Sequence, residues 1–280
     1  MGSEHTLYVS SSACRDIYIN NSVNRFINRL SNPVTLNPHI EYEVGLVSIL
    51  YPSQYYVIAN NDKCLSINTY INTSEGKTEM NTYIYRCNKN IVGGYIKDII
   101  EILNEDLVQE LRVYYNNDYG KYIKKNTVIW WNEKERRVGL KYVRETSIKN
   151  GAVSKITINM SKALGTILGF RGDVDYEIYG LRKKSNILAM NIPIPSGGLD
   201  YIYVYCDIIH PSPFGNQLVN ILDCFTFHNG VNKGIHNTIY KSIKNKFIDE
   251  IAIIITDQNG NGIHFCEGTS ITCVLHIRPR

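Results

Sequence analysis

The chain has 280 residues, of which 44% are hydrophobic and 20% charged, and its formal net charge is +4. This is enough apolar material for one large domain or two ordinary ones, and it excludes wholesale disorder. So mild a positive charge does not by itself indicate a nucleic-acid-binding protein. The 21 Tyr and the abundance of Asn favour many short strands joined by many turns.

The cysteine count and the apolar runs bear on the cellular compartment. Seven Cys are scattered along the chain, and no secretory signal precedes them. An odd number of thiols without a secretory route indicates reduced cysteines in an intracellular protein. The longest apolar runs, such as residues 251–255, are too short to span a bilayer, so we expect a soluble protein without a membrane partner.

The first fifty residues have the pattern of β-structure. Residues 7–10 form a short apolar stretch, and a second stretch, 34–36, follows the turn signal Ser-Asn-Pro at 31–33. "YEVGLVSILYP" (42–52) is typical of a longer strand that stops at its proline.

The middle of the chain changes character. "GYIKDIIEILNEDLVQELRVYY" (94–115) places its Ile and Leu residues at helical spacing, which predicts one long amphipathic helix. Two strand-like runs follow, at 126–131 and 136–143. "SKITINMSKALGTILGF" (154–170) predicts a strand and then a short helix, with Ser161 as N-cap and Gly169 at the C-terminal stop.

From about residue 176 the β-pattern returns. "DYIYVYCDII" (200–209) alternates, with Tyr201, Tyr203 and Tyr205 on one face. "EIAIIITD" (250–257) is apolar on both faces, as expected of a covered central strand. The turn signal "DQNGNG" (257–262) leads to a closing strand at 271–277.

Strands at both ends thus flank a middle that contains a helix. This order predicts a mainly β protein, a β-sandwich built from both ends of the chain with an inserted α+β domain. We place the sandwich at 1–72 and 171–280 and the insertion at 73–170.

Several stretches in the same order resemble one family. They are "LYVSSSACRDIYINNSVNRFINRLSNPVTL" (7–36), "EVGLVSILYP" (43–52), "SKALGTILGF" (161–170), "YVYCDIIHP" (203–211) and "IIITDQNGNGIHFCEGTSITCVLHIR" (253–278). Together they are similar to the minor capsid protein, the penton, of Polinton or Maverick elements and the related adintoviruses.

The resemblance implies a single jelly-roll sandwich that forms a homopentamer at the vertices of an icosahedral capsid. Its partners would be further copies of itself and a major capsid protein made of two jelly rolls. The expected location is the virion capsid, assembled inside the host cell in the nucleus or cytoplasm. The implied role is structural, without catalysis and without a cofactor.

Catalytic and metal-binding motifs are absent from the sequence. Cys206 with His210, and Cys224 with His228, are the nearest nucleophile–base pairs. Four residues along a strand separate such side chains by about 13 Å, which is too far for a hydrogen bond. A structural zinc site normally needs a C-x-x-C pair, and the ends of "CVLH" (273–276) point to opposite faces of a strand. We therefore expect neither catalytic residues nor a metal.

Two surfaces are candidates for binding. Between residues 112 and 155, Lys and Arg outnumber acids and are interleaved with Tyr and Trp, which suits single-stranded nucleic acid. Lys124, Lys125, Arg136 and Arg137 are the candidate nucleic-acid or partner contacts, although we favour packing within the insertion. The second candidate, the stripe Tyr201, Tyr203 and Tyr205, is typical of a subunit interface.

Two other functions remain as alternatives to a capsid role. The insertion could carry a host-attachment or nucleic-acid-binding module, or the chain could be a domesticated transposon protein.

Overall fold

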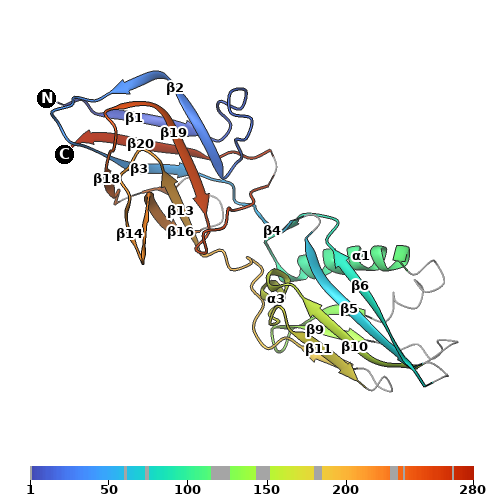
Figure 1. Cartoon of the computed structure of the whole chain (residues 1–280). Coiled ribbons are helices and arrows are strands. Elements are labelled where there is room, and N and C mark those ends of the chain that lie inside the picture. The colour runs from blue at the N-terminus through green and yellow to red at the C-terminus, as the bar shows by residue number, and fades with distance from the viewer. Residues whose placement is uncertain are drawn as a thin grey trace. The chain divides into compact units, whose positions relative to one another are not determined.

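The computed structural model describes residues 2–59, 62–72, 76–114, 127–142, 152–179, 185–227, 233–235, 237–266 and 268–280. The chain forms two compact units (Figure 1). Met1–Tyr55 and Leu199–Arg280 make up the first, here called the end unit, and Tyr56–Gly198 make up the second, here called the inserted unit.

The two larger sheets described in the end unit are antiparallel. In the first sheet, β1 (His5–Ser10) pairs with β20 (Thr272–Pro279), which pairs with β3 (Tyr42–Leu50). The far edge of β3 takes two short strands, β17 (Lys233–Gly234) and β18 (Tyr240–Ser242). In the second sheet the order is β16 (Ile221–Thr226), β13 (Tyr201–Cys206), β19 (Phe247–Thr256) and β2 (Arg25–Thr35).

This strand order is that of a jelly roll. A jelly roll has eight strands, B to I in chain order, in one sheet ordered B-I-D-G and another ordered C-H-E-F. When β1, β2, β3, β13, β16, β18, β19 and β20 are lettered B to I, the two observed sheets have these orders. The predicted mainly β sandwich built from both ends of the chain is therefore confirmed.

Strand alternation explains why the closing residues form a central strand. In β20, Cys273, Leu275 and Ile277 are completely buried, whereas the residues between them lie on the outer face. β20 has a partner along both edges, so its backbone groups are satisfied on both sides. Figure 1 shows this strand, in red, between the blue β1 and β3.

The insertion leaves and re-enters the end unit around one aromatic side chain, Phe227. The ring of Tyr55 meets the ring of Phe227 edge to face, with centroids 5.1 Å apart. The amide of Phe227 donates a hydrogen bond to the carbonyl of Asp200 at 2.8 Å. The residues at both ends of the insertion therefore contact Phe227, which directly follows β16. These contacts lie within the end unit, so the jelly roll is held together there without the insertion.

In its described residues, the inserted unit contains three sheets and two helices. Its largest sheet has the order β11 (Asp175–Tyr179), β10 (Ala152–Met160), β5 (Lys63–Asn72) and β6 (Thr78–Arg86). A second sheet has the order β12 (Ser185–Leu188), β9 (Arg137–Tyr142) and β8 (Thr127–Asn132). β4 (Tyr56–Ile58) pairs with β7 (Ile91–Val92), and the helices are α1 (Ile96–Tyr114) and α3 (Lys162–Leu168).

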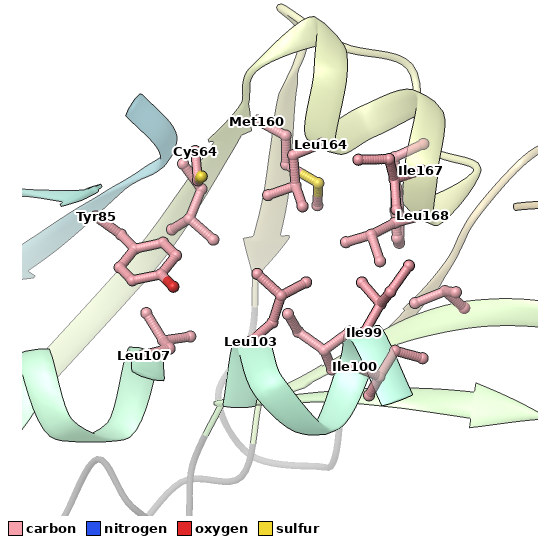
Figure 2. Packing of buried hydrophobic residues seen from close by; sticks show 14 of the residues in the cluster. Cys64, Tyr85, Ile99, Ile100, Leu103, Leu107, Met160, Leu164, Ile167 and Leu168 are labelled. Atoms are coloured by element: carbon pink, nitrogen blue, oxygen red, sulfur yellow. The ribbon is translucent and has the colours of Figure 1, made fainter. Parts of the chain in front are cut away.

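The predicted long helix is α1, and its apolar stripe is buried. Ile99, Ile100, Leu103 and Leu107 face residues of the sheets and of α3 across the core of the inserted unit (Figure 2). The side chain of Asn104 ties the helix to β8, because it donates to the carbonyl of Ile129 at 2.9 Å and accepts from that residue's amide at 3.1 Å.

The short helix α3 has the predicted ends. Ser161 accepts a hydrogen bond from the amide of Leu164 as N-cap, and Gly169 takes the left-handed conformation at the C-cap with φ of 80°. A side chain at Gly169 would also collide with the carbonyl of Asn191, 2.3 Å from the Cβ position.

The inserted unit extends beyond the range 73–170 expected from the sequence at both ends. β5 lies before residue 73 but pairs along its length with β10 and β6. β11 lies after residue 170 and pairs with the other edge of β10. Since strands of one sheet share their hydrogen bonds, the boundaries lie outside these strands, at Tyr56 and Gly198.

Candidate subunit-interface surface

The outer face of the second sheet of the end unit carries the Tyr stripe. In β13 the residues Ile202, Val204 and Cys206 are buried in the sandwich. The alternating residues Tyr201, Tyr203 and Tyr205 therefore point away from the core, and Tyr201 is 46% exposed.

Further apolar side chains extend this stripe. Phe214, on β14 (Ser212–Phe214), is 52% exposed and packs edge to face on Tyr203, with ring centroids 5.7 Å apart. β14 forms a hairpin with β15 (Gln217–Val219). On β19, Ile254 is directly opposite Tyr205 and is 37% exposed. We call the five side chains Tyr201, Tyr203, Tyr205, Phe214 and Ile254 the aromatic face.

Charged residues border the aromatic face on the side of β2. Arg25 and Arg29 point outward there, because Phe26 and Asn28 between them are buried. Arg29 is paired in register with Glu250, whose carboxylate accepts a hydrogen bond from Tyr18 and raises the pKa of that phenol to about 12. An apolar centre with a charged rim is the usual composition of a protein–protein interface.

The expectation for β19 bears on the same surface. Its sequence is apolar on both faces, which predicts a covered central strand. The structure places β19 centrally, between β13 and β2, but leaves Ile254 on the outer face exposed to solvent. The outer face of β19 therefore has an apolar residue, as expected of a covered surface, although a single end unit leaves this face exposed to solvent.

The outer face of the first sheet carries a polar network beside the exposed side chain of Tyr8. Arg278 forms an ion pair with Glu43 at 2.7 Å, and its guanidinium lies 3.6 Å from the ring centroid of Tyr240. The hydroxyl of Tyr240 is 2.9 Å from Nδ1 of His276, whose Nε2 is 3.4 Å from Glu4. His276 and Arg278 lie on the surface, and the two outer faces of the sandwich differ in the side chains that they carry.

The candidate basic residues are only partly described. Lys124 and Lys125 lie outside the described residues. Arg136 is exposed in the turn between β8 and β9, and Arg137 is half-buried at the start of β9. The same turn contains Glu133, which pairs with Lys97 at 2.5 Å, so charges of both signs meet there.

The two Trp residues of this stretch serve the packing of the inserted unit. Trp130 lies against its cross-strand partner Gly139, where an added Cβ would come within 2.4 Å of the indole. Trp131 packs against the hydrophobic core. Both Trp side chains are therefore partly covered by the inserted unit, whereas stacking on bases uses an open aromatic face.

The thiol candidates also have a structural role. Burial raises the pKa of the Cys206 thiol to about 12, which is the wrong direction for a nucleophile at neutral pH. Cys273 faces the core while His276 faces outward, as predicted for a strand. Among the described residues, no group of three His, Cys, Asp or Glu side chains could hold a metal ion. His228 lies outside them.

Within the described part of the chain, no helix combines the length and the apolar character needed to cross a bilayer.

Sequence reasoning identified the three Tyr but missed Phe214 and Ile254. Phe214 belongs to a hairpin of three-residue strands, too short to show a period, and Ile254 was assigned to a covered strand. The signal that unites them is strand pairing, which places residue 254 beside residue 205.

Comparisons with known proteins give similarities to solved structures but no match to a family model or a curated protein. Among solved structures, the chain is similar to the crystal structure of selenomethionine-labelled mavirus penton protein, with a TM-score of 0.48 and 9% sequence identity. The alignment covers 99% of this chain and 100% of that one. The assignment of the end unit to the jelly rolls rests on its own strand order.

Proposed function

We propose that this chain is a structural capsid protein, the penton of an icosahedral Polinton or Maverick-type virion. The observation that carries the proposal is the eight-strand jelly roll, closed by both ends of the chain, with an aromatic outer face left open. Jelly rolls are a recurrent architecture of viral capsid proteins. The stretches of sequence that resemble the Polinton penton family add the vertex role.

The aromatic face is the proposed subunit contact. In a closed ring each subunit presents one surface to one neighbour and a different surface to the other. The two outer faces of the sandwich meet this requirement, since one is aromatic and the other is a polar network around Arg278 and Tyr240. We therefore assign Tyr201, Tyr203 and Tyr205 to the interface of a homopentamer.

The proposed role is not enzymatic and needs no cofactor. The further partner is the major capsid protein with two jelly rolls, which would surround the pentamer in the virion. Assembly would take place inside the host cell.

Electron microscopy and mass measurement of the purified protein test this function. We expect five-fold rings, alone or on mixing with the major capsid protein of the same element. A protein that stays monomeric at high concentration and never associates with that capsid protein contradicts the proposal. A salt-sensitive gel shift at micromolar protein, lost on changing Arg136 and Arg137 to Ser, would instead support the nucleic-acid alternative.

A further inference from the structure

The inserted unit buries two thiols beside each other. Cys64 and Cys87 are each 1% exposed and belong to the core of the unit. Lys63 is opposite Arg86 in β5–β6, whereas Leu65 is opposite Tyr85, so Cys64 is the extra residue of a bulge. The bulge directs Cys64 to the interior, where Figure 2 shows its sulfur above Tyr85.

Backbone contacts bring Cys87 to the same place. Cys87 directly follows β6, and its amide donates a hydrogen bond to the carbonyl of Asp62 at 3.0 Å. The Cys64 thiol is 3.4 Å from that same carbonyl. The amide of Cys87 and the thiol of Cys64 therefore meet at one carbonyl, which brings the two cysteine residues close to each other in the core.

Polar groups around Cys87 fix its side chain. Its sulfur is 2.9 Å from the carbonyl of Lys89, to which the thiol donates, and 3.9 Å from the hydroxyl of Tyr85. That hydroxyl donates in turn to the buried carboxylate of Asp106, on α1, which also accepts from the amide of Asn88 at 3.0 Å. The thiol pair is thus part of a hydrogen-bonded cluster that connects β6 to α1.

The surroundings of the two thiols make them unequal acids. The neighbouring Cys64 side chain lowers the pKa of Cys87, while Cys87 and burial raise the pKa of Cys64. Cys87 is therefore the more readily ionised of the two thiols, and the thiolate is the nucleophilic form. Cys206 and Cys273, in the end unit, are different, because burial raises the pKa of both.

We propose that Cys64 and Cys87 are a redox modification site, at which a small-molecule disulfide such as oxidised glutathione converts the pair into a reversible disulfide. The Cys87 thiolate attacks one sulfur of oxidised glutathione, whose S–S bond breaks and releases one glutathione thiolate. Cys64 loses its proton and attacks the Cys87 sulfur, which releases the second. Two thiols lose two electrons and two protons, and one glutathione disulfide becomes two glutathione molecules.

Access to the pair requires only local opening. Asn88 and Lys89, next to Cys87, are exposed and lie outside regular strands. Opening of this turn breaks the contact of Cys87 with Lys89 and leaves the sheet intact. The disulfide would then tie the bulge of β5 to the end of β6 and close a loop around the β5–β6 hairpin. Such a cross-link stabilises the folded inserted unit by restricting the unfolded chain.

Oxidation of the full-length protein in a glutathione redox buffer tests the site. After incubation the reaction is quenched with acid, the protein is denatured, free thiols are alkylated, and disulfide-linked peptides are identified by mass spectrometry. We expect one internal disulfide, between Cys64 and Cys87, that dithiothreitol reverses. Its rate of formation should rise with pH as the Cys87 thiolate forms, and the inserted unit should melt several degrees higher when it is oxidised.

The chain contains its own matched control. Cys206 and Cys273 are also buried, and the charge of Cys206 acts on Cys273, but burial raises the pKa of both thiols. We expect this pair to stay reduced under conditions in which the exposed Cys224 forms a mixed disulfide with glutathione. Cys64 and Cys87 both recovered as free thiols, while Cys224 reacts, would overturn the proposal.

Two variants give an independent readout. Cys64→Ser should trap Cys87 as a mixed disulfide with glutathione, whereas Cys206→Ser should leave the Cys64–Cys87 link intact. A Cys64→Ser protein that is folded by circular dichroism and yet forms no adduct at Cys87 contradicts the assignment of Cys87 as the attacking sulfur. The site does not depend on the capsid role, because it lies in the inserted unit.

Discussion

Tyr55 and Phe227 meet edge to face, with ring centroids 5.1 Å apart, at the place where the chain leaves the jelly roll. Tyr55 also forms an isolated β-bridge with Phe265, so the residue before the insertion is fixed by two separate contacts. Where the chain returns from the insertion, the carbonyl of Asp200 accepts a hydrogen bond from the amide of Phe227. The jelly roll therefore holds both junctions through its own residues.

This arrangement predicts that the end unit folds without the insertion. Replacing residues 56–198 by a short Gly/Ser linker should give a soluble β protein with cooperative unfolding, because every strand of both sheets remains. Far-UV circular dichroism and thermal melting measure the result. Aggregation of this variant would show that the end unit needs the insertion to fold.

A matched deletion tests the boundaries. Removing 73–170 leaves β5 without β6 and β10, and β11 without β10, so unpaired strand edges are exposed. We expect this shorter deletion to aggregate. Equal solubility of the two deletion variants would contradict the boundaries at Tyr56 and Gly198, because the unpaired strands of the shorter deletion would then not destabilise the protein.

The aromatic face should govern assembly. Changing Tyr201, Tyr203 and Tyr205 together to Ser removes the apolar centre of the proposed interface but leaves the inward side of β13 unchanged. We expect the proposed pentamer to dissociate to monomers, measured by light scattering, with the β-sheet spectrum retained. The control is Tyr95→Ser, since Tyr95 is 82% exposed but lies in the inserted unit. An oligomer mass that the triple change leaves unaltered contradicts the interface.

The closing strand should contribute strongly to the stability of the end unit. Leu275 is completely buried, so Leu275→Ala creates a cavity and should lower the free energy of unfolding by about 2–5 kcal/mol. The control is Val274, which lies beside Leu275 in the chain and on the outer face. Val274→Ala should change the free energy of unfolding by less than about 1 kcal/mol. Urea denaturation followed by circular dichroism compares the two, and equal losses would contradict the orientation of β20.

Local patterns in the sequence were sufficient to predict many elements but not their grouping. The stripe of α1, the caps Ser161 and Gly169 and the alternation of β13 each depend on near neighbours, and each is confirmed. The pairing of β5 with β10 joins residues about ninety positions apart, and nothing local encodes it. For the same reason the Tyr stripe was visible, whereas its extension to Ile254 needed the register of β13 and β19.

Gly139 makes room for a Trp side chain in the inserted unit. Gly139 on β9 is the cross-strand partner of Trp130 on β8, and a Cβ there would lie 2.4 Å from two atoms of the indole. Gly139→Ala therefore forces the ring to move and should destabilise the unit by about 1–3 kcal/mol. Gly94→Ala is the matched control, because no atom lies within 4 Å of the added methyl group.

Tryptophan fluorescence measures this effect selectively. The chain has two Trp residues, Trp130 and Trp131, and both lie on β8, so the fluorescence signal reports the inserted unit alone. We expect Gly139→Ala to lower the midpoint of the fluorescence-detected transition and to shift the emission to longer wavelength, because the displaced indole meets water. Gly94→Ala should leave both unchanged. Identical fluorescence curves for Gly139→Ala and the parent protein would show that the indole does not pack on Gly139 in solution.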